Sequence, residues 1–120
     1  MSIDRSPLAM GLLGGAYRTA RVGPGDIRAD PPAWLRWFVD GAPSPQWLAR
    51  AESVHGVLTS GGHTPAQGAL AWLWARSPRT VPIPGVRTVA QAEQNADAMA
   101  HGPLTAEQLD EVAALLAAPA

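Results

Sequence analysis

Three copies of the spacing Thr-x-x-Gln, starting at Thr64, Thr88 and Thr105, constrain the fold of this 120-residue chain more than any other feature. In this pattern the threonine hydroxyl accepts a hydrogen bond from the backbone N–H three residues later, and the glutamine side chain accepts one from the threonine N–H. Each copy therefore predicts the start of a helix. Thr64 is followed by Pro65, which suits the first helical position because its missing N–H would be unpaired there.

A fourth helix is predicted between Ser44-Pro45 and Gly61-Gly62, because a capping serine and a proline precede an apolar face and glycines follow it. The helix from Thr64 through Ala75 is apolar almost all round, so we expect it to be the most buried one. Amphipathic faces are predicted for the last two helices. They consist of Val89, Ala92, Ala96 and Met99, and of Leu109, Val112, Ala113 and Leu116.

Two short strands are predicted, over residues 2–9 and 80–83, in a chain that is otherwise mostly helical. A strand between helices favours α/β units over a helical bundle. Two strands cannot close a barrel, so open edges and an apolar face are expected. We predict a single α/β domain, 1–120, in three parts: a strand and loop at 1–13, a long lid-like loop at 14–45, and helices with one short strand at 46–120.

An aromatic cluster lies inside the long loop. Trp34, Trp37 and Phe38 have helical spacing within residues 33–39, which predicts a brief helix there. Packing of these rings against the body of the protein is favoured over stacking on a ligand.

Composition excludes several classes of function. A net charge of −1 with 16% charged residues indicates no general attraction to nucleic acid. The longest late apolar run is about 8 residues, against the ~20 needed to cross a bilayer, so no membrane partner is expected. The chain has no cysteine, and its three histidines lack ligand spacing, so no metal site is predicted. These features fit a cytoplasmic protein.

Residues 80–95 combine a strand, a glycine turn and a helix start, an arrangement that suits a phosphorylated adenosine. A helix N-terminus stabilises a phosphate through its unpaired N–H groups and its dipole. Arg87 adds a planar guanidinium suited to a phosphate monoester. Gln91 and Asn95 share a helix face, and with Gln94 they offer amides that can pair with an adenine edge. A capped structural helix with a solvated arginine is the simpler interpretation of the same residues.

The chain closely resembles part of an aldo/keto reductase. The similarity runs in order through Ser6-Pro-Leu-Ala-Met-Gly-Leu-Leu13, Asp26-Ile-Arg28, the stretch 62–73 and residues 80–95. It implies the C-terminal portion of a (β/α)8 barrel, that is, a partial TIM barrel with NADP as cofactor. The family's tetrad of Asp, Tyr, Lys and His falls in the other part of such a barrel. A truncated protein that is not a carbonyl reductase by itself is therefore expected; the sequence has no lysine and one tyrosine, Tyr17.

The resemblance also implies which residues would hold the cofactor. Arg87 would bind the 2′-phosphate, and the residues around the adenine would be Gly85, Gln91, Gln94 and Asn95. The pyrophosphate and ribose would be held by Ser6, Leu8, Ala9 and Met10, with Arg28 matching a contact from the family's lid.

Three departures from the family pattern weaken this site. Arg5 stands where an aromatic ring usually stacks on the nicotinamide, Ala16 replaces a lysine that contacts the pyrophosphate, and Gln94 replaces a glutamate. A lost stacking ring and a lost cation each reduce affinity. We therefore predict weak NADP binding, led by the adenine end.

Two classes of function stay open. One is reuse of the fold for redox-neutral chemistry, such as cyclisation, isomerisation or dehydration, on a hydrophobic metabolite, with Asp4 near a strand end as a weak candidate acid or base. The other is a non-catalytic NADP-binding or assembly module that completes a partner barrel half. Open strand edges and the apolar helix carrying Trp72 and Trp74 predict a homodimer or higher oligomer in either case.

Overall fold

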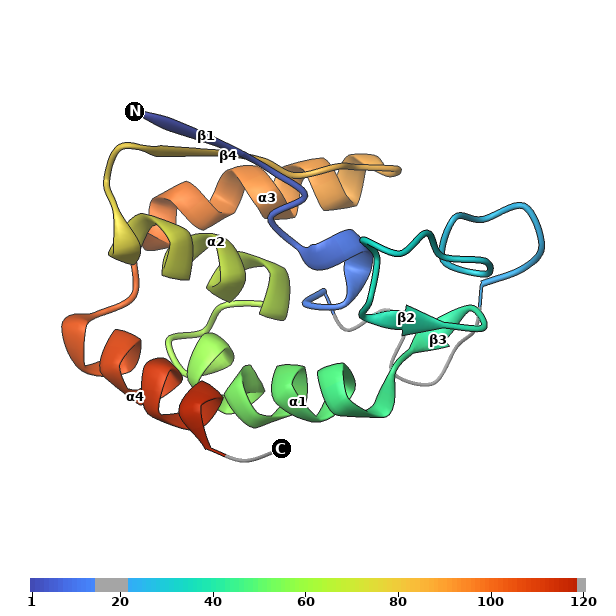
Figure 1. Ribbon diagram of the computed structural model, residues 1–120. Coiled ribbons are helices and arrows are strands. Elements are labelled where there is room, and N and C mark those ends of the chain that lie inside the picture. The colour runs from blue at the N-terminus through green and yellow to red at the C-terminus, as the bar shows by residue number, and fades with distance from the viewer. Residues whose placement is uncertain (15–21, 119–120) are drawn as a thin grey trace.

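The computed structural model describes residues 1–14 and 22–118, with the side chain of Met10 excepted. Within these residues the main elements are the helices α1 (Pro45–Thr59), α2 (Pro65–Arg76), α3 (Val89–His101) and α4 (Ala106–Ala117). Figure 1 shows α2 in the middle, with α3 on one side and α1 and α4 on the other. The predicted, mostly helical architecture with four main helices is confirmed. None of the described helices is long and apolar enough to cross a membrane.

The Thr-x-x-Gln spacing forms complete capping boxes at two of its three positions. At the start of α2, the Thr64 hydroxyl accepts from the Gln67 N–H at 3.2 Å, and the Gln67 carboxamide oxygen accepts from the Thr64 N–H at 3.0 Å. Thr105 and Gln108 make the same pair of bonds at the start of α4. These reciprocal bonds satisfy backbone donors that the helices cannot pair internally.

The other two helix starts differ from the prediction. Thr88 accepts from the Gln91 N–H, but the Gln91 carboxamide oxygen accepts from the N–H of Arg87, one residue earlier than the box requires. At α1, Ser44 occupies the capping position without a side-chain bond, and the Leu48 N–H closes the first turn on its carbonyl.

Two strands, β1 (Ser2–Arg5) and β4 (Thr80–Ile83), pair in parallel with Ser2 opposite Thr80. β1 is shorter than the predicted 2–9, because Ser6 takes a left-handed φ of 52° and the chain turns into a short 3-10 helix, η1 (Ala9–Gly11). The sheet has an exposed apolar surface formed by Ile3, Val81 and Ile83. The open, apolar sheet predicted from the sequence is therefore present.

The predicted helix at 33–39 is wrong. Phe38–Val39 forms strand β2, which pairs antiparallel with β3 (Ala42–Pro43). Asp40 and Gly41, with φ of 49° and 78°, form the turn between them. Two consecutive left-handed residues suit a hairpin turn that matches the twist of its strands. A helix of seven residues is too short to compete, since helix nucleation is costly.

The apolar core is divided into two clusters. The first joins α1, α2 and α4 through Val54, Val57, Leu58, Ala71, Leu104 and Val112. The second joins the segment after β1 to the hairpin through Leu12, Leu35 and Phe38, with Trp37 and Trp47 packed on it. Phe38 and Trp37 thus pack as predicted, whereas Trp34 is 59% exposed.

The close approach of α2 to α1 depends on a glycine. All residues from 66 to 71 are buried, which makes α2 the most buried helix, as predicted. A Cβ on Gly68 would lie 2.1 Å from the carbonyl oxygen of Leu58, so only glycine fits here without a shift of backbone.

The apolar face predicted for α3 is wrong. Val89, Ala92, Ala96 and Met99 are all exposed, and the buried residue of α3 is Ala98. The cause is tertiary: the Gln67 side chain on α2 donates to the Gln94 carbonyl at 2.9 Å and holds the other face of α3 against α2. In α4, Val112 is buried and Leu109 is half-buried, but Ala113 and Leu116 are exposed.

Candidate functional site

A groove of about 810 Å³ lies where the ends of β1 and β4 meet the loop at 25–28 and the first turns of α3. It brings together eight of the ten cofactor residues predicted from the sequence: Ser6, Leu8, Arg28, Gly85, Arg87, Gln91, Gln94 and Asn95. Ala9 lines a different cavity, and Met10 has no described side chain. Ala16, at the position of the family's lysine, lies outside the described residues. The roles of these residues stay predictions.

The turn before α3 is shaped by Gln91. Its carboxamide oxygen accepts from the Arg87 N–H at 2.7 Å, while its own N–H donates to the Thr88 hydroxyl at 3.1 Å. These bonds fold the Gln91 side chain back over the turn that carries Arg87. Gln94 and Asn95 follow on the groove side and are half-buried, whereas Arg87 is exposed. The arrangement offers a cation and several amide groups to a bound molecule.

The loop wall of the groove is held by an ion pair between Asp26 and Arg28. The Arg28 Nε donates to Oδ1 at 2.8 Å, one terminal nitrogen donates to Oδ2 at 2.5 Å, and the backbone N–H donates to Oδ1 at 2.9 Å. These bonds, with a smaller contribution from the charge of Arg87, hold the pKa of Asp26 well below its ordinary value. Arg28 is 6% exposed and also lies over the Phe38 ring. Its guanidinium therefore supports the loop that forms the wall.

The groove is electropositive. Its lining includes three arginines, Arg5, Arg28 and Arg87, against the single carboxylate of Asp26. A surplus of fixed positive charge in a concave surface favours an anionic ligand. Sequence reasoning noted Arg5 only as the loss of an aromatic ring and missed its place in this lining. It also gave no role to four apolar members of the lining, although they lie within the stretches that resemble the family: Pro7, Ala66, Ile83 and Val86.

A strained turn connects the groove to the interior. Ser6 and Ala9 both have a left-handed φ of 52°, which costs a non-glycine residue about 1 kcal/mol or more. The Trp37 indole N–H donates to the Ala9 carbonyl at 2.9 Å and holds the second of these residues in place. Pro7, between them, lines both the groove and a second cavity.

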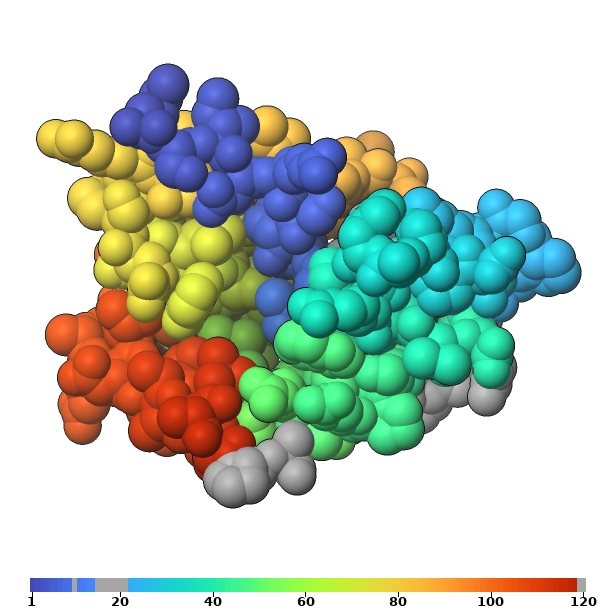
Figure 2. Space-filling model, viewed as in Figure 1, coloured from blue at the N-terminus to red at the C-terminus, as the bar shows by residue number. Residues whose placement is uncertain are grey.

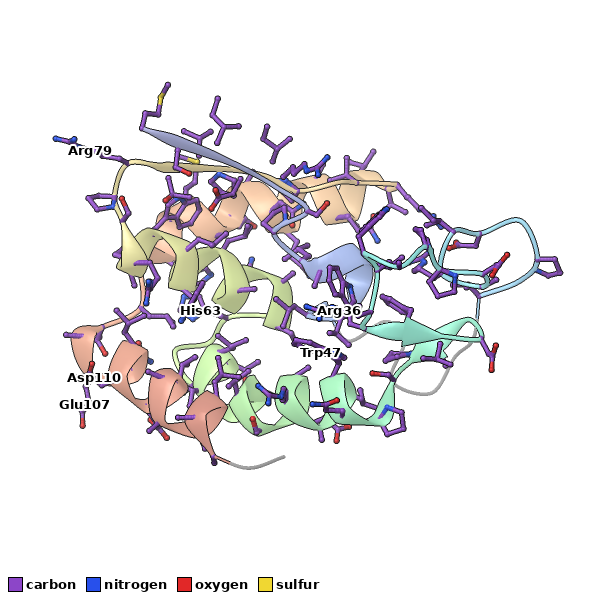
Figure 3. The ribbon with its side chains drawn as sticks, in the orientation of Figure 1. Arg36, Trp47, His63, Arg79, Glu107 and Asp110 are labelled. Atoms are coloured by element: carbon purple, nitrogen blue, oxygen red, sulfur yellow. The ribbon has the colours of Figure 1, made fainter. Side chains whose placement is uncertain are left out.

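This second cavity, of about 390 Å³, separates the two core clusters and is almost wholly apolar. Figure 2 shows the surface hollowed where the segments around η1, α1, α2 and α4 meet. Trp47 extends from the first turn of α1 toward it (Figure 3). Its lining side chains come from α1, α2, α4, the segment around η1 and the residue before β2. They include Leu12, Trp37, Trp47, Arg50, Val54, Ala69, Trp72 and Val112. The sequence contained no contiguous motif that could have predicted it.

The remaining candidate residues lie elsewhere. Asp4, on β1, accepts a hydrogen bond from the Ser2 hydroxyl at 2.9 Å and is not among the described residues that line the groove. His63 packs edge to face on His101, with ring centres 4.8 Å apart. Burial, and then the nearby charge of His101, lower the pKa of His63. Within the described residues there is no cluster of three or more His, Cys, Asp or Glu side chains that could hold a metal ion.

Comparison with known proteins gives the family. The aldo/keto reductase family model matches residues 2–117, so the chain belongs to this family. The aldo-keto reductase yakc [NADP(+)] of Schizosaccharomyces pombe is 32% identical over 96 residues. That match covers 78% of this chain but 26% of the yeast protein, so the chain spans about a quarter of this relative. No solved structure matches the chain.

Proposed function

We propose that the chain binds the 2′-phosphate and adenine end of NADP and does not reduce carbonyl compounds by itself. The groove is the observation that supports this most. Arg87, Gln91 and Asn95, which the sequence motif suggested as ligands of a phosphorylated adenosine, line one electropositive wall. The name of the yeast relative includes NADP(+), which supports the same cofactor.

The nicotinamide end is expected to contribute little. Arg5 lines the groove where the family has an aromatic ring, so stacking on the nicotinamide is lost. The sequence has no lysine, so the tetrad that supports hydride transfer in the family cannot be assembled from this chain. Weak, adenine-led binding without reductase activity follows from these two features.

Titration calorimetry tests the proposal. NADP and 2′-phospho-ADP-ribose, which lacks the nicotinamide, should bind with equal affinity, and NAD should bind more weakly because it lacks the 2′-phosphate. Submicromolar NADP binding that depends on the nicotinamide would contradict the proposal. So would consumption of NADPH with a panel of aldehydes at a rate above that of a heat-treated control.

A second candidate function is redox-neutral chemistry on a hydrophobic metabolite. The observation that favours it is the apolar cavity, which is separate from the groove and within the size range of ligand sites. Cyclisation, isomerisation or dehydration would then proceed without a change in NADPH absorbance, and mass spectrometry of the products would detect it. Asp4 stays the weak candidate for an acid or base. Copurification of the chain with a separate barrel half would instead favour an assembly module.

The exposed apolar sheet supports self-association. Ile3, Val81 and Ile83 are 61%, 47% and 56% exposed, a pattern typical of surfaces that a partner covers. We expect a homodimer or higher oligomer with an apolar interface of roughly 2,000 Å². Light scattering is the test, and a stable monomer at micromolar concentration would contradict this expectation.

A further inference from the structure

Among the described residues that line the cavity between the two core clusters, one has a charged side chain, Arg50 of α1. The other described lining residues are aliphatic or aromatic, so they offer no competing polar group of comparable strength. Apolar pockets with a few placed polar groups are the usual form of small-molecule sites, because the apolar walls give affinity and the polar groups fix orientation.

Arg50 is half-buried, and its Nε atom is buried without a hydrogen-bond partner. Its guanidinium lies over the ring of Trp47, with Cζ 5.6 Å from the ring centre. Stacking on an aromatic face leaves the edge of a guanidinium available for hydrogen bonds in its plane. A buried donor without a partner on a charged group raises the free energy of the folded chain. A ligand that accepts a hydrogen bond from it removes this penalty and therefore binds more tightly.

We infer that this cavity binds a hydrophobic carboxylic acid, whose carboxylate accepts hydrogen bonds from Arg50 and whose apolar chain lies between α1 and α2. A carboxylate matches a guanidinium in charge and in planar geometry. A phosphate ester would bring a second negative charge among apolar walls in which the described residues offer no second cation. The inference names a ligand class for the second candidate function, but it rests on the cavity residues and not on the groove.

Decanoate and decanol are the probes, used below the concentrations at which they aggregate. They share an apolar chain and differ in the head group, so their ratio of affinities isolates the contribution of the carboxylate. By titration calorimetry the wild-type chain should bind decanoate at least about tenfold more tightly than decanol, as expected for a charge-assisted hydrogen bond.

Matched variants test whether Arg50 causes the preference for decanoate over decanol. Arg50→Gln should remove this preference, with the fold checked by circular dichroism. Arg76→Gln is the control, because Arg76 also lies over a tryptophan, Trp72, at 5.6 Å but is not among the residues that line the cavity. It should keep the wild-type preference. If Arg50→Gln does not fold, Arg50→Lys is the alternative, because it keeps the positive charge but lacks the planar guanidinium. Its preference for decanoate over decanol should be weaker than that of the wild type but still present.

Two further measurements separate this inference from the nucleotide proposal. Ala51→Leu narrows the cavity and should weaken decanoate and decanol alike. Arg87→Gln should leave decanoate binding unchanged while it weakens NADP binding. Equal affinity of the wild type for the two probes would overturn the inference, as would a preference that survives in Arg50→Gln, or the absence of saturable decanoate binding.

Discussion

The groove and the cavity share Pro7 as a common wall, yet they are built by different forces. Hydrogen bonds and an ion pair shape the groove, as in the bond from Arg87 to Gln91 and the pairing of Asp26 with Arg28. The cavity is mainly the space left between two apolar clusters, with one hydrogen bond in its wall, from the Trp37 indole N–H to the Ala9 carbonyl. The helices α1 and α2, which both line it, approach each other closely at Gly68.

This difference implies that the two sites respond to different changes. Apart from the buried Arg28, polar side chains of the groove are at least partly exposed, so substitutions there should alter ligand affinity while the fold stays intact. Changes in helix packing should alter the cavity and the stability of the whole chain together, because interiors are close-packed.

Gly68→Ala should have the largest effect. The added methyl group would lie 2.1 Å from the Leu58 carbonyl oxygen, a backbone atom that cannot rotate away, so α1 and α2 must separate. Overpacking of this kind lowers the free energy of unfolding by about 3 kcal/mol. Urea denaturation measures this free energy.

Gly56→Ala, on α1, is the control. A Cβ there has no neighbour within 4 Å, and the higher helix propensity of alanine should stabilise the fold by about 0.5–1 kcal/mol. Equal effects of the two substitutions would contradict the packing argument.

Arg87→Gln should weaken binding of 2′-phospho-ADP-ribose by about thirtyfold, or ~2 kcal/mol, because one charged donor to the phosphate is lost. Unfolding by urea should be unchanged, since Arg87 is exposed. The matched control is Arg79→Gln, an exposed arginine before β4 that is not among the residues lining the groove. A similar loss of affinity in both variants would point to general electrostatics instead of a local site.

Trp37→Phe keeps an aromatic ring but removes the indole N–H that donates to the Ala9 carbonyl. The free energy of unfolding should fall by about 1 kcal/mol, since the Ala9 carbonyl loses one of its two donors and keeps the Leu12 N–H. Trp34→Phe should change it by less than about 0.5 kcal/mol, because that ring is 59% exposed. If the two variants were equally stable, the bond to Ala9 would contribute nothing to holding the turn.

Protonation of His63 at low pH should have the smallest effect on the free energy of unfolding. Burial lowers the pKa of this imidazole in the folded state, so the unfolded chain binds the proton more readily. The stabilisation is therefore fully present above about pH 6.5, the ordinary histidine pKa, and declines as the pH falls below it. His63→Gln should reduce the slope of unfolding free energy against pH in this range. His55→Gln is the comparison variant and should leave the slope as in the wild type. An unchanged slope in His63→Gln would show that His63 is not the cause of the pH dependence.

Local patterns predicted much of the fold. The caps at Thr64 and Thr105 act within four residues, so the sequence alone contained the whole interaction. The hairpin was missed although Asp40-Gly41 is a typical turn pair, because its strands are two residues long and the aromatic spacing favoured a helix. The face of α3 was wrong because a hydrogen bond from α2 decides it, and no periodicity within α3 encodes that bond.

The two sites differ in the same way. Most groove residues come from two contiguous motifs, so the set was predictable even though its geometry was not. The cavity combines residues from five separate segments, and Arg50 lies within an ordinary helix. Its position beside Trp47 follows from their spacing of three residues on α1. Its place in the cavity lining depends on how α1 packs against α2 and α4, which is a property of the tertiary structure.

The side chain of Gln67 links the start of α2 to the middle of α3 through two hydrogen bonds. One end of its amide closes the turn at Thr64, and the other holds the carbonyl of Gln94 at the edge of the groove. If the segment before α2 moves farther than a hydrogen bond can stretch, it must therefore carry the α3 wall of the groove with it or break this bond. A residue on the neighbouring helix thus fixes the position of the groove wall that α3 forms.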